Sequence, residues 1–143
     1  MTEKTELAIM EFCQYNGIDS DEVIEKINDN DVNFEIDNYR FIHKDVIDDI
    51  MCGEMSDDAY FLGSYNAWFI AENTDLPINI IEALQKADEF EAIGQYIIDT
   101  GFVEAMQQGT VSYDGYGLHF AHYDGNEIED LLNVCGYYVF RVN

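Results

Sequence analysis

The sequence predicts an α+β fold of short helices and small mixed or antiparallel sheets. Hydrophobic residues make up 48% of the 143 residues and aromatic residues 14%, which is enough apolar material for a folded core. Apolar side chains recur at helical spacing in some stretches and alternate with polar ones in others, so both kinds of element are expected. We expect one elongated domain over residues 1–143, or two lobes of about 1–58 and 59–143.

The first third of the chain predicts two helices and then a strand or a strand pair. Residues 5–15 place apolar side chains at helical spacing, and Gly17 ends this helix. Asp19 suits the cap of a second helix, because Glu22 follows three residues later as in a capping box. Over 33–42, apolar and acidic side chains alternate, as on a strand with one buried face.

The middle third predicts helices on both sides of an aromatic strand. A helix is expected over 44–51, followed by a linker over 53–58. The stretch YFLGSYNAWFIA, residues 60–71, is rich in aromatic residues, which favour a strand or a bent hairpin. Pro77 marks the first turn of a further helix, and another is expected over 89–99.

The last third permits two interpretations. Side chains over 111–123 alternate as on a strand, and an Asp-Gly pair within them suits a hairpin turn, but a helix over 113–120 competes with it. Beyond this stretch we expect a short helix over 126–132 and a final strand over 137–142.

Two aromatic stretches, 33–42 and 60–70, are alike, and each precedes a predicted helix. One explanation is a small αβ unit that was duplicated and has diverged. The other is that two aromatic strands in one domain resemble each other by chance. The sequence leaves both explanations open.

The charge balance excludes several classes of function. The chain carries 30 Asp and Glu against 6 Lys and Arg, a net charge of −24. Proteins that bind nucleic acid neutralise phosphates with Lys and Arg, and anionic membranes repel acidic proteins, so neither is an expected partner. No apolar run approaches the length of a membrane span, and charged residues precede any apolar run at the N-terminus. We therefore expect a cytoplasmic protein with reduced thiols at its three cysteines.

Few residues match the patterns of catalytic or metal sites. His119, His122 and Asp124 are the best metal candidates, because two histidines three apart share one face of a helix, although they diverge on a strand. Residues 29–33 begin like a calcium loop, but Phe34 stands where that loop requires glycine. There is no phosphate-binding glycine loop, nucleophile elbow or HExxH motif. We expect no enzyme, no metal and no cofactor.

The acidic residues lie in short groups between apolar residues with helix or strand spacing, so a folded core holds them at fixed positions. Their mutual repulsion opposes folding, which suggests that the surface has a use. Adaptation to high salt and plain solubility are two alternatives. Fixed carboxylates also approximate duplex DNA, which has about one negative charge per 1.7 Å of axis. The predicted contact residues are Asp19, Asp21, Glu22, Glu25, Asp29, Asp31, Glu35, Asp37, Asp45, Asp48 and Asp49, with Asp88, Glu89 and Glu91 as a second patch.

A second hypothesis is a protein–protein adaptor that binds through exposed aromatic residues. Its candidate patch consists of Trp68, Phe69, Tyr137 and Tyr138, for each of which core burial is the alternative. A salt titration separates the hypotheses, because a charged interface weakens with salt and an apolar one barely responds.

Five short motifs carry a family resemblance. They are GIDSDEVIEKI (17–27), NDNDVNFEIDNYRF (28–41), YIIDTG (96–101), YDGYG (113–117) and GYYVFRV (136–142). In this order they resemble the ArdA antirestriction proteins, acidic DNA mimics of phages and mobile elements. The resemblance implies an elongated inhibitor, monomeric or homodimeric and without catalytic residues, in the DNA channel of a type I restriction–modification enzyme. The expected partner is thus a DNA-binding complex of bacterial defence, whether restriction–modification, phage exclusion or CRISPR.

Overall fold

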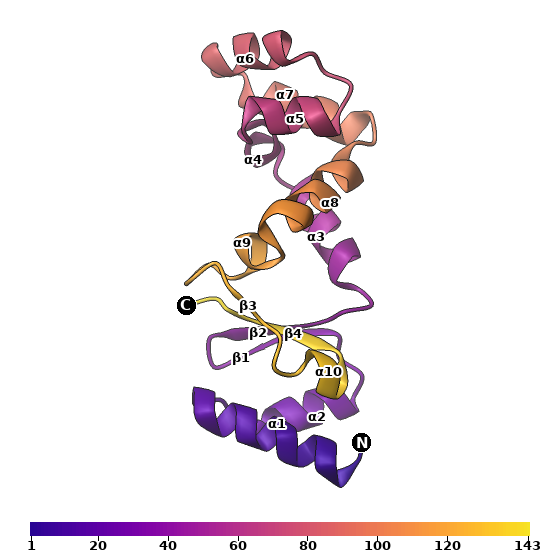
Figure 1. The fold of residues 1–143 in the computed structure, drawn as a ribbon, viewed down its shortest axis with the longest axis vertical. Coiled ribbons are helices and arrows are strands. Elements are labelled where there is room, and N and C mark those ends of the chain that lie inside the picture. Colours follow the sequence, from indigo (N-terminus) through magenta and orange to yellow (C-terminus); the bar gives the residue numbers. More distant parts are fainter. The chain divides into compact units, whose positions relative to one another are not determined.

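The computed structural model describes residues 1–143 and has the predicted fold class, with ten helices and one four-stranded antiparallel sheet (Figure 1). The chain forms two compact units. Unit 1 combines Met1–Ile47 with Asp114–Asn143, and unit 2 is Asp48–Tyr113. The division differs from the expected boundary near residue 58, because the C-terminal segment returns to pair with the N-terminal strands.

Unit 1 contains the sheet. Its elements are α1 (Glu3–Asn16), α2 (Ser20–Asn28), β1 (Asn33–Ile36), β2 (Tyr39–His43), α9 (Gly117–Phe120), β3 (Glu127–Ile128), α10 (Leu132–Cys135) and β4 (Tyr137–Arg141). The strand order is β1-β2-β4-β3, and all neighbours are antiparallel. β4 therefore joins the two distant parts of the chain, a pairing that no local pattern could predict.

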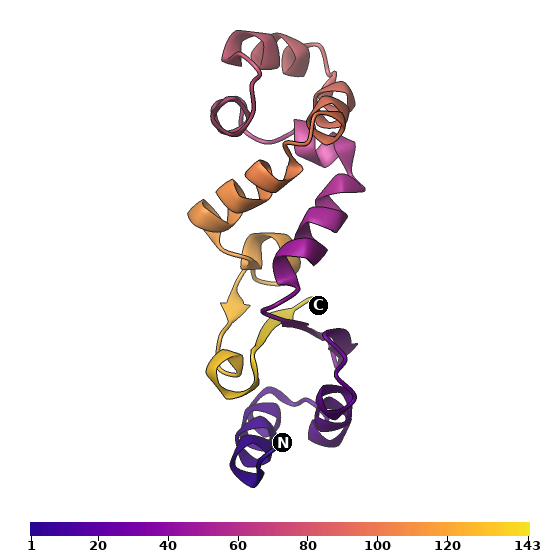
Figure 2. The same cartoon turned by 90° about the vertical axis from the view of Figure 1, so that its right-hand side faces the viewer.

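The ends of the first two helices confirm the predicted signals. Gly17 has a φ of 70°, and the next amide, of Ile18, donates to the Cys13 carbonyl oxygen at 2.9 Å. The Asp19 side chain accepts from the Glu22 amide at 3.2 Å and caps α2. Between these signals the chain turns sharply, so α1 and α2 pack against each other (Figure 2).

The core of unit 1 lies between the sheet and the first two helices. Phe34 and Phe41 are cross-strand partners whose rings stack at 4.9 Å, and both are buried beside Ile9 of α1 and Val23 of α2. The predicted alternation in the first strand is confirmed. The other face of the sheet carries Phe140, whose ring packs at 5.1 Å against Phe120 of α9.

Unit 2 is entirely helical. Its helices are α3 (Ile47–Ser56), α4 (Ala59–Gly63), α5 (Ala67–Asn73), α6 (Ile78–Lys86), α7 (Phe90–Asp99) and α8 (Val103–Asp114). The helix expected over 44–51 is α3, which begins three residues later than expected. It continues to Ser56, so the linker predicted over 53–58 is wrong. The helices expected after Pro77 and over 89–99 are confirmed as α6 and α7.

The aromatic stretch 60–71 forms α4 and α5, so the predicted strand or hairpin is wrong. Asp58 caps α4 by accepting from the Phe61 amide at 3.0 Å, and Asn66 caps α5. The buried Phe69 then packs among helices, where an aromatic residue gains as much burial as it would in a sheet. Since unit 2 holds no strand, the duplicated αβ unit is also excluded.

Two glycines allow α4 and α7 to approach closely. A Cβ atom on Gly63 would overlap the Phe90 carbonyl group, and one on Gly94 would overlap that of Ala59. Neither obstacle is a movable side chain, because both are backbone. The helix pair therefore depends on having no side chain at either position.

In the last third, the helical alternative is nearer to the structure than the strand. α8 continues to Asp114, and Gly115, with a φ of 70°, follows the helix instead of turning a hairpin. The helix predicted over 126–132 is wrong, since β3 lies within this range and α10 begins only at Leu132, its last residue. Gly136 ends α10, and the final strand is confirmed as β4.

Candidate protein-binding surfaces

The carboxylates of this protein are at the surface. None of the 30 acidic residues is buried, and thirteen of the fourteen predicted contact residues are exposed, with Asp31 half-buried. They are therefore available to a partner. Nine of the fourteen belong to unit 1 and five to unit 2.

The densest row follows the outer face of α2. Asp21, Glu25 and Asp29 are four residues apart, so each lies about 6 Å beyond the last along the helix axis, with Glu22 beside them. The opposite face buries Val23 against the core. Four charges over about 12 Å approach the spacing of one DNA strand, about 3.4 Å per phosphate.

Three further carboxylates, those of Asp19, Asp37 and Asp31, extend this row at its ends. At the start of α2, the Asp19 amide donates to Asp37 Oδ2 at 2.9 Å, which brings the β1–β2 turn to the helix N-terminus. Asp37 and Asn38 have φ angles of 50° and 71°, so the turn is of a type that favours such residues. Beyond the C-terminus of α2, Asp31 lies with Oδ2 3.9 Å from Lys26 Nζ. We call this row the acidic ridge; it comprises Asp37, Asp19, Asp21, Glu22, Glu25, Asp29 and Asp31.

The other predicted contact residues lie elsewhere. Glu35 alternates with the buried Phe34 and Ile36, so it lies on the sheet face away from α2, in register with Arg40. Asp45 follows β2, with Oδ2 3.6 Å from His43 Nδ1. The remaining residues belong to unit 2 and lie on α3 (Asp48 and Asp49) and at the start of α7 (Asp88, Glu89 and Glu91).

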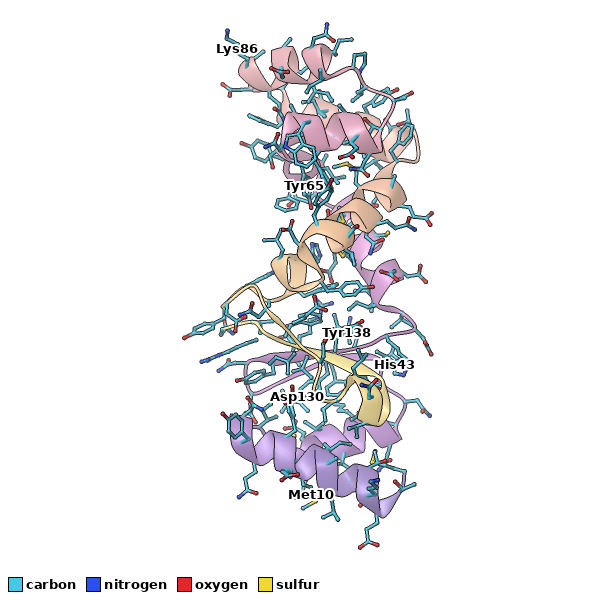
Figure 3. The ribbon with its side chains drawn as sticks, in the orientation of Figure 1. Met10, His43, Tyr65, Lys86, Asp130 and Tyr138 are labelled. Carbon is cyan, nitrogen blue, oxygen red and sulfur yellow. The ribbon has the colours of Figure 1, made fainter.

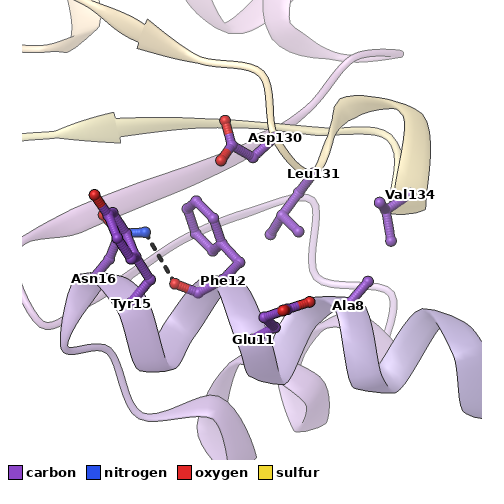
Figure 4. A pocket seen from close by; sticks show the side chains of 8 residues that line it. All are labelled: Ala8, Glu11, Phe12, Tyr15, Asn16, Asp130, Leu131 and Val134. Carbon is purple, nitrogen blue, oxygen red and sulfur yellow. Dashed lines mark hydrogen bonds between the residues drawn. The ribbon is translucent and has the colours of Figure 1, made fainter.

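A groove between α1 and the α10 region also carries carboxylates, and sequence reasoning missed it. It encloses about 420 Å³, and Glu11 and Asp130 lie on opposite sides of an apolar floor that includes Leu131 (Figure 4). Tyr15, at 89% exposure, borders it. Its walls come from segments more than a hundred residues apart, so no local pattern could indicate it.

The predicted aromatic patch of four residues does not form. Phe69 and Tyr137 are only 6% and 3% exposed, whereas Trp68 is 46% exposed. Moreover, Tyr137 and Tyr138 belong to β4 of unit 1, and the other two to α5 of unit 2. The Tyr137 hydroxyl donates to the Asp31 carbonyl oxygen, and burial raises its pKa to about 12. Tyr137 thus serves the core beneath the acidic ridge.

The two histidines considered for metal binding lie in α9 and just after it. His119 packs its ring at 4.7 Å against Phe120, and His122 Nε2 lies 3.2 Å from the His119 carbonyl oxygen. No three His, Cys, Asp or Glu side chains are grouped so that they could hold a metal ion. Burial, followed by the nearby Asp19, raises the pKa of the Cys13 thiol to about 11, so at neutral pH it is not a nucleophilic thiolate.

None of the helices combines the length and the apolar run that a bilayer crossing requires.

Comparison with known proteins gives no match: no family model, no curated protein and no solved structure is significantly similar to this chain.

Proposed function

We propose that this protein inhibits a bacterial DNA-targeting defence system by presenting the acidic ridge to the basic DNA-binding groove of its target. A restriction–modification complex is the first candidate target. The observation that carries the proposal is the continuous row of carboxylates along one exposed helix, continued at both ends by Asp37 and Asp31.

The ridge has the density and the rigidity that a polyanion mimic needs. Its spacing approaches that of phosphates on one strand, and its helix is fixed by a buried face, a cap and a tight hairpin. Lys26 is the only basic residue on α2, so most of the charge is left to a partner. Such a field accelerates association with a basic groove and makes the affinity sensitive to salt.

The fold lowers the cost of crowding these charges. Asp19 and Asp37 both meet the N-terminus of α2, where the helix dipole and free amides favour negative charge. The exposed positions of the remaining carboxylates keep them solvated. The ridge is thus compatible with a stable unit 1.

The test is a variant in which four carboxylates of the acidic ridge are replaced by uncharged amides of the same shape. We expect Asp21→Asn, Glu22→Gln, Glu25→Gln and Asp29→Asn together to weaken binding to a purified type I restriction–modification complex at least about tenfold. The matched control neutralises four exposed acids elsewhere, Glu3→Gln, Glu72→Gln, Asp114→Asn and Glu129→Gln, with the same change in net charge. Binding is measured in competition with duplex DNA.

In cells, the wild-type protein should raise the plating efficiency of unmodified phage on a restricting host, and the ridge variant should not. Equal activity of the ridge and control variants would show that the ridge is not the contact. Binding that duplex DNA does not displace would refute mimicry of DNA.

An alternative function is an adaptor that engages a protein partner through aromatic residues. The half-exposed Trp68 favours it, although the full predicted patch does not form. Salt separates the two functions: a mimic should lose at least about tenfold in affinity between about 50 and 200 mM salt, and an aromatic interface should change little.

A further inference from the structure

Unit 2 exposes a connected cluster of aromatic rings. Tyr65 and Phe69 stack at 5.2 Å, and Phe61 meets Tyr65 at the same distance. Trp68 meets both Phe69, at 6.0 Å, and Tyr113, at 5.7 Å. Trp68 and Tyr113 are 46% and 61% exposed, so a part of this ring surface faces water. Figure 3 labels Tyr65 in this region.

In unit 1, by contrast, arginine side chains cover two of the aromatic rings. The chain has two arginines, both in unit 1, and each lies over a ring: Arg40 over Phe120 at 5.1 Å and Arg141 over Tyr123 at 3.8 Å. Unit 2 contains no arginine, and its single basic residue, Lys86, is in the last turn of α6. Against that one charge stand 13 acidic residues. No arginine of unit 2 can therefore lie over its aromatic rings in the way that the two arginines of unit 1 lie over Phe120 and Tyr123.

A groove in unit 2 brings a ring and a carboxylate together. It encloses about 480 Å³ between α6 and the segment that joins α4 to α5. Trp68 lines it from α5, and Ile78 and Glu82 line it from one face of α6, since they are four residues apart. Phe90, next to the predicted acidic residues Glu89 and Glu91, completes an apolar part of the lining.

The groove is preorganised by a side chain that spans it. Gln85 Nε2, on α6, donates to the carbonyl oxygens of Gly63 at 3.0 Å and Tyr65 at 2.8 Å. These two bonds hold the α4–α5 segment against α6. An incoming side chain therefore meets walls that are already in position.

We propose that this groove binds an arginine side chain of a basic partner protein. Trp is the strongest aromatic partner of a cation, and a guanidinium both stacks on an indole and pairs with a carboxylate, here that of Glu82. The arginine stem would lie on Ile78 and Phe90. The identity of the occupant follows from charge complementarity. The inference rests on the proposed function, because that function supplies a suitable partner: a DNA-binding groove is rich in arginine.

The experiment uses Trp68 as a reporter, because it is the only tryptophan in the chain. The full-length protein is titrated with the blocked peptide Gly-Arg-Gly while Trp68 emission is recorded. Parallel titrations use the lysine peptide and the citrulline peptide, which has the shape of arginine without its charge. We expect saturation with arginine, at least about threefold weaker binding of lysine, and no saturation with citrulline.

Variants locate the response. Glu82→Gln should weaken arginine binding at least about threefold, and Glu72→Gln, an exposed acid on α5 that does not line the groove, should leave it unchanged. Circular dichroism checks that each variant is folded. Absence of saturable binding would overturn the proposal, as would equal binding of arginine and lysine that Glu82→Gln does not affect.

The outcome is separable from that of the proposed function. The peptide titration involves no defence complex, and the ridge variant should bind the arginine peptide as the wild type does. If the ridge variant loses the complex but keeps the peptide, both inferences stand. If the peptide does not bind but the ridge result holds, the groove proposal alone fails.

Discussion

The two units have similar net charge but achieve it differently. Unit 1 has 17 acidic and 5 basic residues, whereas unit 2 has 13 acidic residues and one lysine. In unit 1, three basic residues contact side chains of the same unit: Lys26 lies beside Asp31, and both arginines lie over aromatic rings. Unit 2 folds almost without cations.

The difference shows that net charge alone does not describe an acidic surface. In unit 1, carboxylates form a row along α2, whose opposite face packs into the core beside the sheet. Unit 2 combines dispersed carboxylates with exposed rings, on helices packed through glycine. The first arrangement suits a polyanion mimic and the second a site for single cationic side chains.

The largest expected effect tests the sheet core of unit 1. Phe41→Ala should reduce the free energy of unfolding by about 3–5 kcal/mol, because the ring is fully buried and stacked on Phe34. Tyr15→Ala, in the same unit but 89% exposed, should change it by less than about 0.5 kcal/mol. Urea denaturation measures both. Similar losses for the two variants would mean that the core is not where the structure places it.

The next effect tests glycine packing in unit 2. Gly94→Ala should destabilise by at least about 2 kcal/mol, since the clash with the Ala59 backbone outweighs the gain in helix propensity of about 1 kcal/mol. Gly53→Ala, in α3 with open space around it, should stabilise by up to about 1 kcal/mol. Thermal unfolding followed by circular dichroism compares them. If both substitutions stabilise, α4 and α7 are not in close contact.

A smaller effect separates structural from electrostatic roles in the acidic ridge. Asp19→Ala should cost about 1 kcal/mol, because the cap on the Glu22 amide is lost. Asp19→Asn keeps a capping oxygen and should leave stability nearly unchanged while removing one charge. Chemical denaturation of the two variants is the measurement. A loss as large for Asn as for Ala would assign the stabilisation to charge and not to capping.

The last effect is confined to alkaline pH and concerns unit 1. The pKa of Cys13 is about 11 in the folded protein and near 9.0 in an exposed thiol, so the unfolded chain releases its proton first. Its contribution to stability is therefore present below pH 9 and lost between about pH 9 and 11. Urea denaturation should show a shallower decline over this range for Cys13→Ala than for the wild type. An unchanged slope would indicate that the thiol is not buried.

Local signals predicted the N-terminal helices, their cap and stop, the first strands and the last strand. Local signals also gave one wrong prediction. Residues 60–71 have the composition of a strand, but capping by Asp58 and burial among helices make them helical. The acidic ridge was partly predictable, because residues four apart on a helix share a face. The acids outside α2 that join the ridge could not be predicted.

The sequence by itself determined the excess of carboxylates, the fold class and the face of α2 that carries the densest row, since these depend on composition and on spacing within one element. Only the tertiary structure decided that Asp37 meets Asp19, that Glu35 faces away, and that Trp68 and Glu82 share a groove. Each of these depends on contacts between segments distant in the chain, and such contacts arise from packing of whole elements, which local spacing does not encode.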